Sequence, residues 1–256
     1  MSPTIRIGVA GASGRMGVVV AGVIADREGA ALAARFGRLG ATDEDLAGCE
    51  VIIDFTSGAA SAALATRAGA NGGPALVIGS TGFSAGEEAA VRAASARIAM
   101  VKSGNFSIGV TLLAGLVEQA ARKLDRKDWD IEIVEAHHRL KRDAPSGTAL
   151  MLARAAADGR GEALADIAAR NRDGTAGPRR EGEIGFSVLR GGGIIGEHAV
   201  VFAAEDEILT LSHSARDRRL FARGAVEAAV WVVGRSPGLY DMMDVRGVRR
   251  DGNRVP

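Results

Sequence analysis

The chain has 256 residues, of which 47% are apolar, and this is enough for one large domain or two medium-sized ones. Its 32 basic and 31 acidic residues give a net charge of +1, which provides no field that would favour nucleic acid or a membrane surface. A single cysteine (Cys49), no zinc-type spacing of cysteine and histidine, no signal segment and no membrane-length apolar run predict a cytoplasmic protein without metal, nucleic-acid or membrane partners.

The N-terminal segment carries a glycine-rich loop between a strand and a helix. Residues 5–10 are a short, largely apolar strand, and residues 18–26 are helical in character. Between them, Gly11, Gly14 and Gly17 permit a tight turn and a close approach of a pyrophosphate to the helix start. The pattern predicts a dinucleotide-binding fold. The alternative is a purely structural turn, because glycine often punctuates strand–helix connections.

The second expected strand, residues 31–36, ends without the carboxylate that holds the adenosine ribose in many such folds. Gly37 follows instead, with Arg35 and Arg38 close by. Arginines without a carboxylate favour the 2′-phosphate of NADPH. NADPH is therefore the expected cofactor and NADH the second choice, unless both arginines are solvated surface charges.

Strands and helices alternate over the first hundred residues. Apolar strands are expected at residues 50–56, 75–79 and 98–101, with a helix at 57–69 between the first two. Another helix should begin at the capping pair of Ser84 and Glu87. The alternation predicts an α/β protein with a Rossmann-type, doubly wound parallel sheet, in which ligands bind beyond the carboxyl ends of the strands.

The most informative segment is residues 134–150, which follows an alternating strand at 129–134 and precedes a helix-forming run at 149–157. It contains a group of residues suited to binding an anion and moving a proton: His137, His138, Lys141, Ser146, Gly147 and Thr148. Unpaired N–H groups at a helix start attract a carboxylate, and histidine exchanges a proton near neutral pH. The alternative is an ordinary capping turn with surface charges.

The remaining residues predict a second domain of α+β type. An apolar helix is expected at 108–123, a long loop at 158–182, and a helix at 219–233. Strands are expected at 184–190, 197–203 and 207–213. Their short connections indicate an antiparallel or mixed sheet, whose open face favours oligomerisation. Arg179 and Arg180 in the loop could meet substrate carboxylates, but solvated arginines are the preferred interpretation.

The sequence resembles the 4-hydroxy-tetrahydrodipicolinate reductase (dihydrodipicolinate reductase) family, which acts in the diaminopimelate route to lysine. The resemblance rests above all on residues 135–149, the segment containing both histidines, Lys141 and the Ser146–Thr148 turn. Further matching motifs run in family order at residues 11–17, 54–56, 79–83, 105–107, 190–191, 196–198 and 221–225.

The resemblance implies a Rossmann domain at 1–107 and 216–256, an inserted substrate-binding and tetramerisation domain at 108–215, and hydride transfer from NADPH or NADH to a dicarboxylate. It implies catalytic roles for His137 and Lys141. Implied substrate contacts are His138, Ser146, Gly147 and Thr148. Implied cofactor contacts are Gly11, Ala12, Ser13, Gly14, Arg15, Met16, Arg38, Gly79, Ser80, Thr81, Ser103, Gly104, Asn105 and Phe106. The family often has an acidic residue where Gly37 stands, which weakens the case for NADH.

Two alternatives stay open at this point. One is a related Rossmann reductase that acts on a different imine or amino acid. The other is a protein that senses NADP(H) without catalysis, which would need the glycine loop but not His137 and Lys141 beside an anion site.

Overall fold

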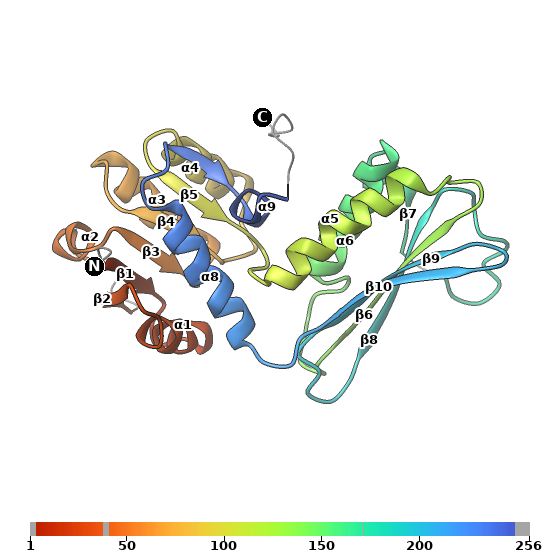
Figure 1. Cartoon of the computed structure of the whole chain (residues 1–256), viewed down its shortest axis with the longest axis horizontal. Coiled ribbons are helices and arrows are strands. Elements are labelled where there is room, and N and C mark those ends of the chain that lie inside the picture. Colours follow the sequence, from red (N-terminus) through yellow and green to blue (C-terminus); the bar gives the residue numbers. More distant parts are fainter. Residues whose placement is uncertain (1–3, 38–40, 171, 249–256) are drawn as a thin grey trace. The chain divides into compact units, whose positions relative to one another are not determined.

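The structure is a computed structural model, shown in Figure 1. It describes residues 4–37, 41–170 and 172–248. These residues form two compact units, and the chain leaves the first unit at Ile108 and re-enters it at Arg218. The second unit is therefore an insertion, made of residues 109–217.

The first unit is built on a six-stranded sheet in which all strand pairings are parallel. In spatial order the strands are β11 (Gly238–Tyr240), β5 (Ala99–Lys102), β4 (Ala75–Ile78), β3 (Val51–Asp54), β1 (Ile5–Ala10) and β2 (Ala30–Phe36). From β1 the chain goes to β2 on one side and later to β3 on the other, so the topological switch point lies at the carboxyl ends of β1 and β3. The predicted doubly wound α/β fold is confirmed.

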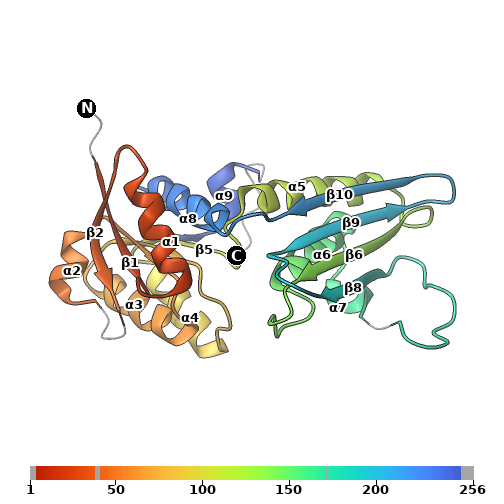
Figure 2. The ribbon, with the colours of Figure 1, turned by 90° about the horizontal axis from the view of Figure 1, so that it is seen from below.

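Helices cover both faces of this sheet (Figures 1 and 2). One face packs against α1 (Arg15–Ala25) and α8 (Arg219–Val232), and the other packs against α2 (Asp43–Gly48), α3 (Gly58–Ala70) and α4 (Ala85–Ser95). Alternate strand residues enter the two cores, as Ile53 does on one face and Ile52 on the other. Burial on both faces explains why the strands read as continuous apolar runs. Each fully buried isoleucine contributes about 1.5–3 kcal/mol.

The second unit contains a mixed sheet of five strands. In spatial order they are β10 (Ile208–Ser214), β9 (Glu197–Ala203), β6 (Asp130–His137), β8 (Ile184–Arg190) and β7 (Ala168–Ala169). The central strand β6 pairs in parallel with β8 and antiparallel with β9. The three predicted strands after residue 183 are present, as β8, β9 and β10, and the sheet is mixed, as predicted.

One face of this second sheet is covered by α5 (Ile108–Lys123) and α6 (Gly147–Arg160). The core between them includes Ile131 and Ile133 of β6 and Leu152 of α6. The opposite face carries Val134, which is 42% exposed, because side chains alternate along the strand. The sheet therefore presents an apolar face that no helix of the unit covers among the described residues.

Two expectations need correction. The segment at 158–182 is not only a loop, because it forms the short α7 (Leu164–Ile167) and then β7. In addition, the residues after α8, for which the sequence predicted no element, add β11 to the first sheet and then form α9 (Met242–Arg246), which Asp241 caps through a capping box. Strands of two or three residues are too short to show an alternating pattern.

Arg179 is also not a solvated charge. Its side chain is 19% exposed, and its guanidinium donates hydrogen bonds to Asp130 Oδ1 at 2.8 Å and to the Ile131 carbonyl at 2.9 Å. It therefore fastens the loop before β8 to the start of β6. No helix within the described residues is long and apolar enough to cross a membrane.

Candidate active site

The glycine-rich loop leaves the start of α1 open to an anion. Gly11 adopts a positive φ of 73°, which a residue with a side chain rarely adopts. A Cβ at Gly17 would lie 2.2 Å from the Gly11 carbonyl oxygen, so the helix approaches the loop more closely than a side chain would allow. The N-cap residue, Gly14, offers no side-chain cap, and the first turn contains no acidic residue. The N–H groups of this turn are thus available to a phosphate, as the predicted dinucleotide site requires.

Two further loops at the carboxyl edge of the first sheet carry predicted cofactor residues. Ser80 is buried, and its hydroxyl lies 2.8 Å from that of Ser61 on α3. In the loop after β5, the Ser103 hydroxyl donates to the Asn105 carbonyl at 2.7 Å, while Asn105 Oδ1 accepts from Ser107 N–H. The backbone of the loop after β5 is therefore held by hydrogen bonds within the loop, and the Ser80 side chain is held against α3. Thr81 and Gly104 are exposed, in keeping with a contact to a ligand.

Residues 54–56 join these loops. A Cβ at Gly79 would lie 2.2 Å from the Phe55 ring, and that ring makes an edge contact with Phe106 at 5.8 Å between centroids. The space beside Gly11 is closed by Thr56 Cγ2 and the Phe55 carbonyl, at 3.1 and 3.2 Å from a Cβ placed there. Residues 54–56 therefore contact all three of the predicted cofactor loops.

Asp54 holds the segment of residues 54–56 in place. It is fully buried at the end of β3, and its Oδ1 accepts hydrogen bonds from the Thr56 amide at 2.8 Å and the Thr56 hydroxyl at 2.6 Å. Burial raises the pKa of Asp54, while hydrogen bonds from Ser61 and Thr56 oppose that shift. The sequence motif had suggested the family but not this connecting role.

The adenosine end of the predicted site is only partly described. Arg35 and Gly37 lie at the exposed end of β2. Arg38 lies outside the described residues, so its predicted contact has no structural account. A Cβ at Gly37 would meet nothing within 4 Å, which means that a side chain could be accommodated there.

In the second unit, the loop from β6 to α6 contains the residues that the sequence predicts to bind an anion. The Ser146 hydroxyl caps α6 by accepting a hydrogen bond from Ala149 N–H at 3.1 Å. Gly147 and Thr148 follow in the first turn, and Gly147 is exposed. A serine cap contributes about 1 kcal/mol to a helix and fixes its start. The remaining N–H groups of this turn suit a carboxylate.

Lys141 lies in the same loop. Its ammonium pairs with Asp143 Oδ2 at 2.9 Å, and its side chain is 20% exposed. Its backbone N–H donates to the His138 carbonyl at 3.0 Å, which closes a turn. Burial acts to raise the pKa of Asp143, but the hydrogen bond and charge of Lys141 lower it overall. His138 is half-buried next to His137.

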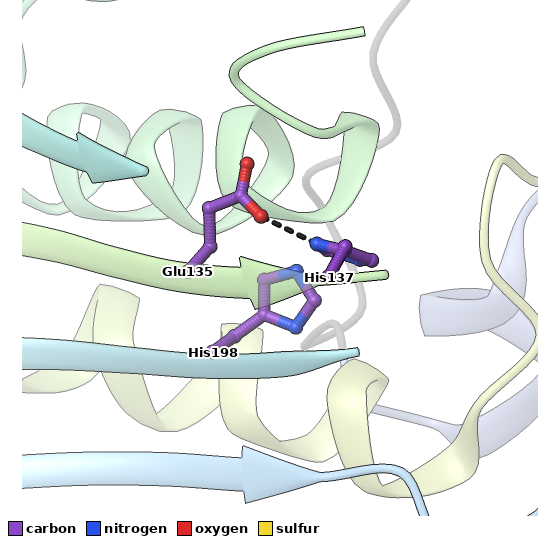
Figure 3. A group of neighbouring side chains, drawn as sticks. All are labelled: Glu135, His137 and His198. Atoms are coloured by element: carbon purple, nitrogen blue, oxygen red, sulfur yellow. Dashed lines mark hydrogen bonds and ion pairs between the residues drawn. The ribbon is translucent and has the colours of Figure 1, made fainter. Parts of the chain in front are cut away.

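His137, the last residue of β6, points into a buried polar cluster with Glu135 and His198 (Figure 3). Its Nδ1 is hydrogen-bonded to Glu135 Oε2, and its ring makes an edge contact with His198 at 5.0 Å between centroids. Burial lowers the pKa of His137, and Glu135 opposes that shift. The alternation of β6 explains the pair, because residues two apart share one face of a strand.

His198, from β9, is paired with the capping serine. Its Nε2 lies 3.1 Å from the Ser146 hydroxyl. Burial, together with the charge of His137, lowers the pKa of His198 to about 4. His198 is therefore neutral at physiological pH, and it anchors the helix start instead of supplying charge.

Glu135, His137 and His198 bring three ligand-type atoms within 4.8 Å of one another, a spacing that could hold a metal ion. Glu135, however, already accepts hydrogen bonds from the Arg190 guanidinium at 2.9 Å on both oxygens. That fixed positive charge opposes a cation at the same carboxylate. The cluster is thus better suited to proton transfer than to metal binding.

Comparison with known protein families places both units in one family. Residues 5–106 match the family model described as "Dihydrodipicolinate reductase, N-terminus", and residues 109–245 match "Dihydrodipicolinate reductase, C-terminus". The first match lies within the first unit, and the second covers the inserted unit together with the C-terminal residues that return to the first unit. Together they cover nearly all of the chain.

Individual relatives agree. The 4-hydroxy-tetrahydrodipicolinate reductase of Caulobacter vibrioides is 59% identical over 98% of this chain and 100% of its own length. The enzyme of the same name from Rhizobium rhizogenes is 48% identical over 95% of this chain and 97% of its own. A solved dipicolinate-bound dihydrodipicolinate reductase from Paenisporosarcina sp. TG-14 shares the fold, with a TM-score of 0.74 at 21% identity over 95% of this chain and 99% of that one.

Proposed function

The chain belongs to the dihydrodipicolinate reductase family, and from this we infer that it reduces 4-hydroxy-tetrahydrodipicolinate to tetrahydrodipicolinate with NAD(P)H, in the diaminopimelate route to lysine. The observation that carries the inference beyond family membership is the loop from β6 to α6. This short segment contains His137, Lys141 and the serine-capped start of α6.

The proposed roles follow from the chemistry of each group. The substrate's carboxylates bind at the start of α6 through Ser146, Gly147 and Thr148, with His138 beside them. A bound NAD(P)H would supply a hydride to the unsaturated ring, and the 4-hydroxyl group leaves as water, which consumes one proton. His137 or Lys141 donates that proton, because both lie beside the anion site and both can carry a dissociable proton.

The first unit is proposed to bind the cofactor. The uncapped start of α1 suits the pyrophosphate, since Gly14 leaves its N–H groups unpaired by a side chain. Proposed contacts are Gly11, Ala12, Ser13, Gly14, Arg15, Met16, Gly79, Ser80, Thr81, Ser103, Gly104, Asn105 and Phe106. The proposed domain bounds remain 1–107 and 216–256 for this unit and 108–215 for the substrate and oligomerisation unit.

NADPH is the proposed physiological cofactor, with NADH as a weaker substitute. Support comes from Gly37, which provides no carboxylate to repel a 2′-phosphate, and from Arg35 and Arg38 in the sequence beside it. The test is Gly37→Asp, because an added side chain meets nothing within 4 Å. We expect the KM for NADPH to rise and that for NADH to fall; unchanged constants would show that this position does not select the cofactor.

A homotetramer formed through the open face of the second sheet is proposed. The face includes Val134 on β6, and also Leu189 on β8 and Ile208 on β10, which are 53% and 68% exposed. Apolar residues in such number are expensive to leave in water. Light scattering of the purified protein should give four times the chain mass. A cytoplasmic location fits the buried, unpaired Cys49.

The activity is tested by following NADPH absorbance with freshly generated 4-hydroxy-tetrahydrodipicolinate and without it. For Lys141→Ala we expect kcat to fall by roughly 10²- to 10⁴-fold, the usual contribution of a general acid, while NADPH binding is retained. Lys127→Ala, at an exposed lysine of the same unit, is the matched control. No decay despite tight NADPH binding would favour a non-catalytic NADP(H) sensor, and decay only with another imine would favour a related reductase.

A further inference from the structure

Glu135 is a buried carboxylate to which the proposed function assigns no role. It lies on β6 two residues before His137, and its side chain has no exposed surface. An isolated carboxylate is very costly to bury, so its partners must account for its place. Those partners come from β6 itself, from the start of α6 and from the end of β8.

All of the groups that contact this carboxylate are hydrogen-bond donors. Ser146 N–H, at the start of α6, donates to Oε1 at 3.0 Å. Arg190, at the end of β8, donates from Nη2 to Oε1 and from Nη1 to Oε2, both at 2.9 Å. His137 Nδ1 is hydrogen-bonded to Oε2. Such a bidentate arginine pair has a fixed geometry.

Arg190 is itself held in place. Its guanidinium also donates to the Asp143 carbonyl at 2.7 Å and to the Leu189 carbonyl at 2.8 Å. Burial acts to raise the pKa of Glu135, but Arg190, His137 and Ser146 outweigh it and lower that pKa below its ordinary value. Glu135 is therefore ionised at physiological pH, and an ionised carboxylate can only accept hydrogen bonds.

This arrangement determines which nitrogen of His137 can react. Because the carboxylate only accepts, Nδ1 must carry a hydrogen in both protonation states of the ring. The proton that the ring gains or loses is then on Nε2. A Cβ at Gly196 would lie 3.1 Å from Nε2, so the missing side chain there leaves room around this nitrogen.

We propose that Glu135, held by Arg190, is the positioning residue that fixes the tautomer and orientation of His137 and directs its Nε2 toward the substrate. This inference rests on the proposed role of His137 as an acid. The charged groups around the ring are Glu135, Arg190 and Lys141, and the neutral His198 makes the remaining contact. Only Glu135 among these favours the protonated ring.

The test is the variant Glu135→Gln, which keeps the shape and removes the charge. An amide group facing Nδ1 can donate, which favours the wrong tautomer. We expect kcat to fall by at least about tenfold and by no more than the loss of the general acid itself would cause, with the KM for NADPH unchanged. Loss of the carboxylate also lowers the pKa of His137, so the fall of kcat with rising pH should move to lower pH.

Glu183→Gln is the matched control. Glu183 is likewise buried and paired with an arginine, Arg172, but it precedes β8, whereas Arg190 ends that strand. Glu183 therefore lies roughly 20 Å from Arg190, at the opposite end of the strand. We expect Glu183→Gln to lower the melting temperature and to leave both kcat and its pH profile unchanged.

A double-mutant cycle separates positioning from a merely structural role. If Glu135 acts through His137, then Glu135→Gln should lower kcat by less than about twofold when added to His137→Gln. An undiminished effect in that background, or a single variant with kcat and pH profile unchanged, would overturn the proposal. If Glu135→Gln does not fold, Glu135→Asp replaces it, with the same expected loss of kcat and the same refuting result. Full activity of His137→Gln would instead overturn both this inference and the proposed role of His137.

Discussion

Replacing Gly224 by alanine should displace the loop that contains Phe106, one of the proposed cofactor contacts. Gly224 lies on α8, where the helix touches the backbone of the loop that contains Phe106. A Cβ at this position would lie 1.7 Å from the Phe106 carbonyl oxygen, and ordinary contact begins at 3.4 Å. Helix and loop must therefore separate by roughly 1.7 Å, and neither atom belongs to a flexible side chain.

The size of the effect follows from that displacement. Overpacking of this kind costs about 1–3 kcal/mol or more. For a protein of this size, each kcal/mol corresponds to about 2–4 °C in melting temperature, so we expect a fall of roughly 2–12 °C. Displacing the loop by more than 1 Å should also reduce kcat/KM for NADPH by on the order of 100-fold.

The assay is a thermal melt together with steady-state kinetics at varied NADPH. Gly22→Ala is the control, because Gly22 lies inside α1 and a Cβ there meets nothing within 4 Å. That change should stabilise the protein by about 0.5–1 kcal/mol through helix propensity. A Gly224→Ala protein that melts and binds NADPH like the parent would refute the reasoning.

Three further changes have distinct expected results. The pKa of His198 is about 4, below its ordinary value, so between pH 6.5 and 4 the unfolded chain binds this proton and the folded chain does not. The free energy of unfolding should therefore decrease by about 3 kcal/mol as the pH falls through that window. In urea unfolding, His198→Gln should show a weaker dependence of this free energy on pH. Burial raises the pKa of Asp54, so the free energy of unfolding should fall as the pH rises above the ordinary pKa of an aspartate. Thermal melts of Asp54→Asn should lack this decline. The same pH dependence in the variant and the parent would contradict the prediction. Arg179→Ala leaves Asp130 without its ion-pair partner and removes the hydrogen bond to the Ile131 carbonyl, while Glu132 keeps its pair with Arg172. The variant should have a lower melting temperature and an unchanged kcat; a lower kcat would place this loop in the reaction.

Much of the fold could be predicted because its signals are local. The inner strands β3 and β4 are buried on both faces, so each appears as an apolar run. The start of α6 could be predicted for the same reason, since Ser146 caps a helix that follows it directly. A three-residue strand such as β11 has no such signal, because its place depends on β5, more than a hundred residues earlier.

The candidate site shows the same division between local and distant signals. His137 and Lys141 are four residues apart, and their chemistry is visible in the sequence. The partners of Glu135 are not, because Arg190 is separated from it by 55 residues and the contact exists only through the parallel pairing of β6 and β8. In that pairing His137 lies opposite Arg190, so the register of two strands decides which arginine reaches the carboxylate. A shift of one residue would turn Arg190 to the other face of the sheet and leave Glu135 without its charge partner. The protonation chemistry of His137 therefore depends on the register of the sheet as well as on the motif that contains it.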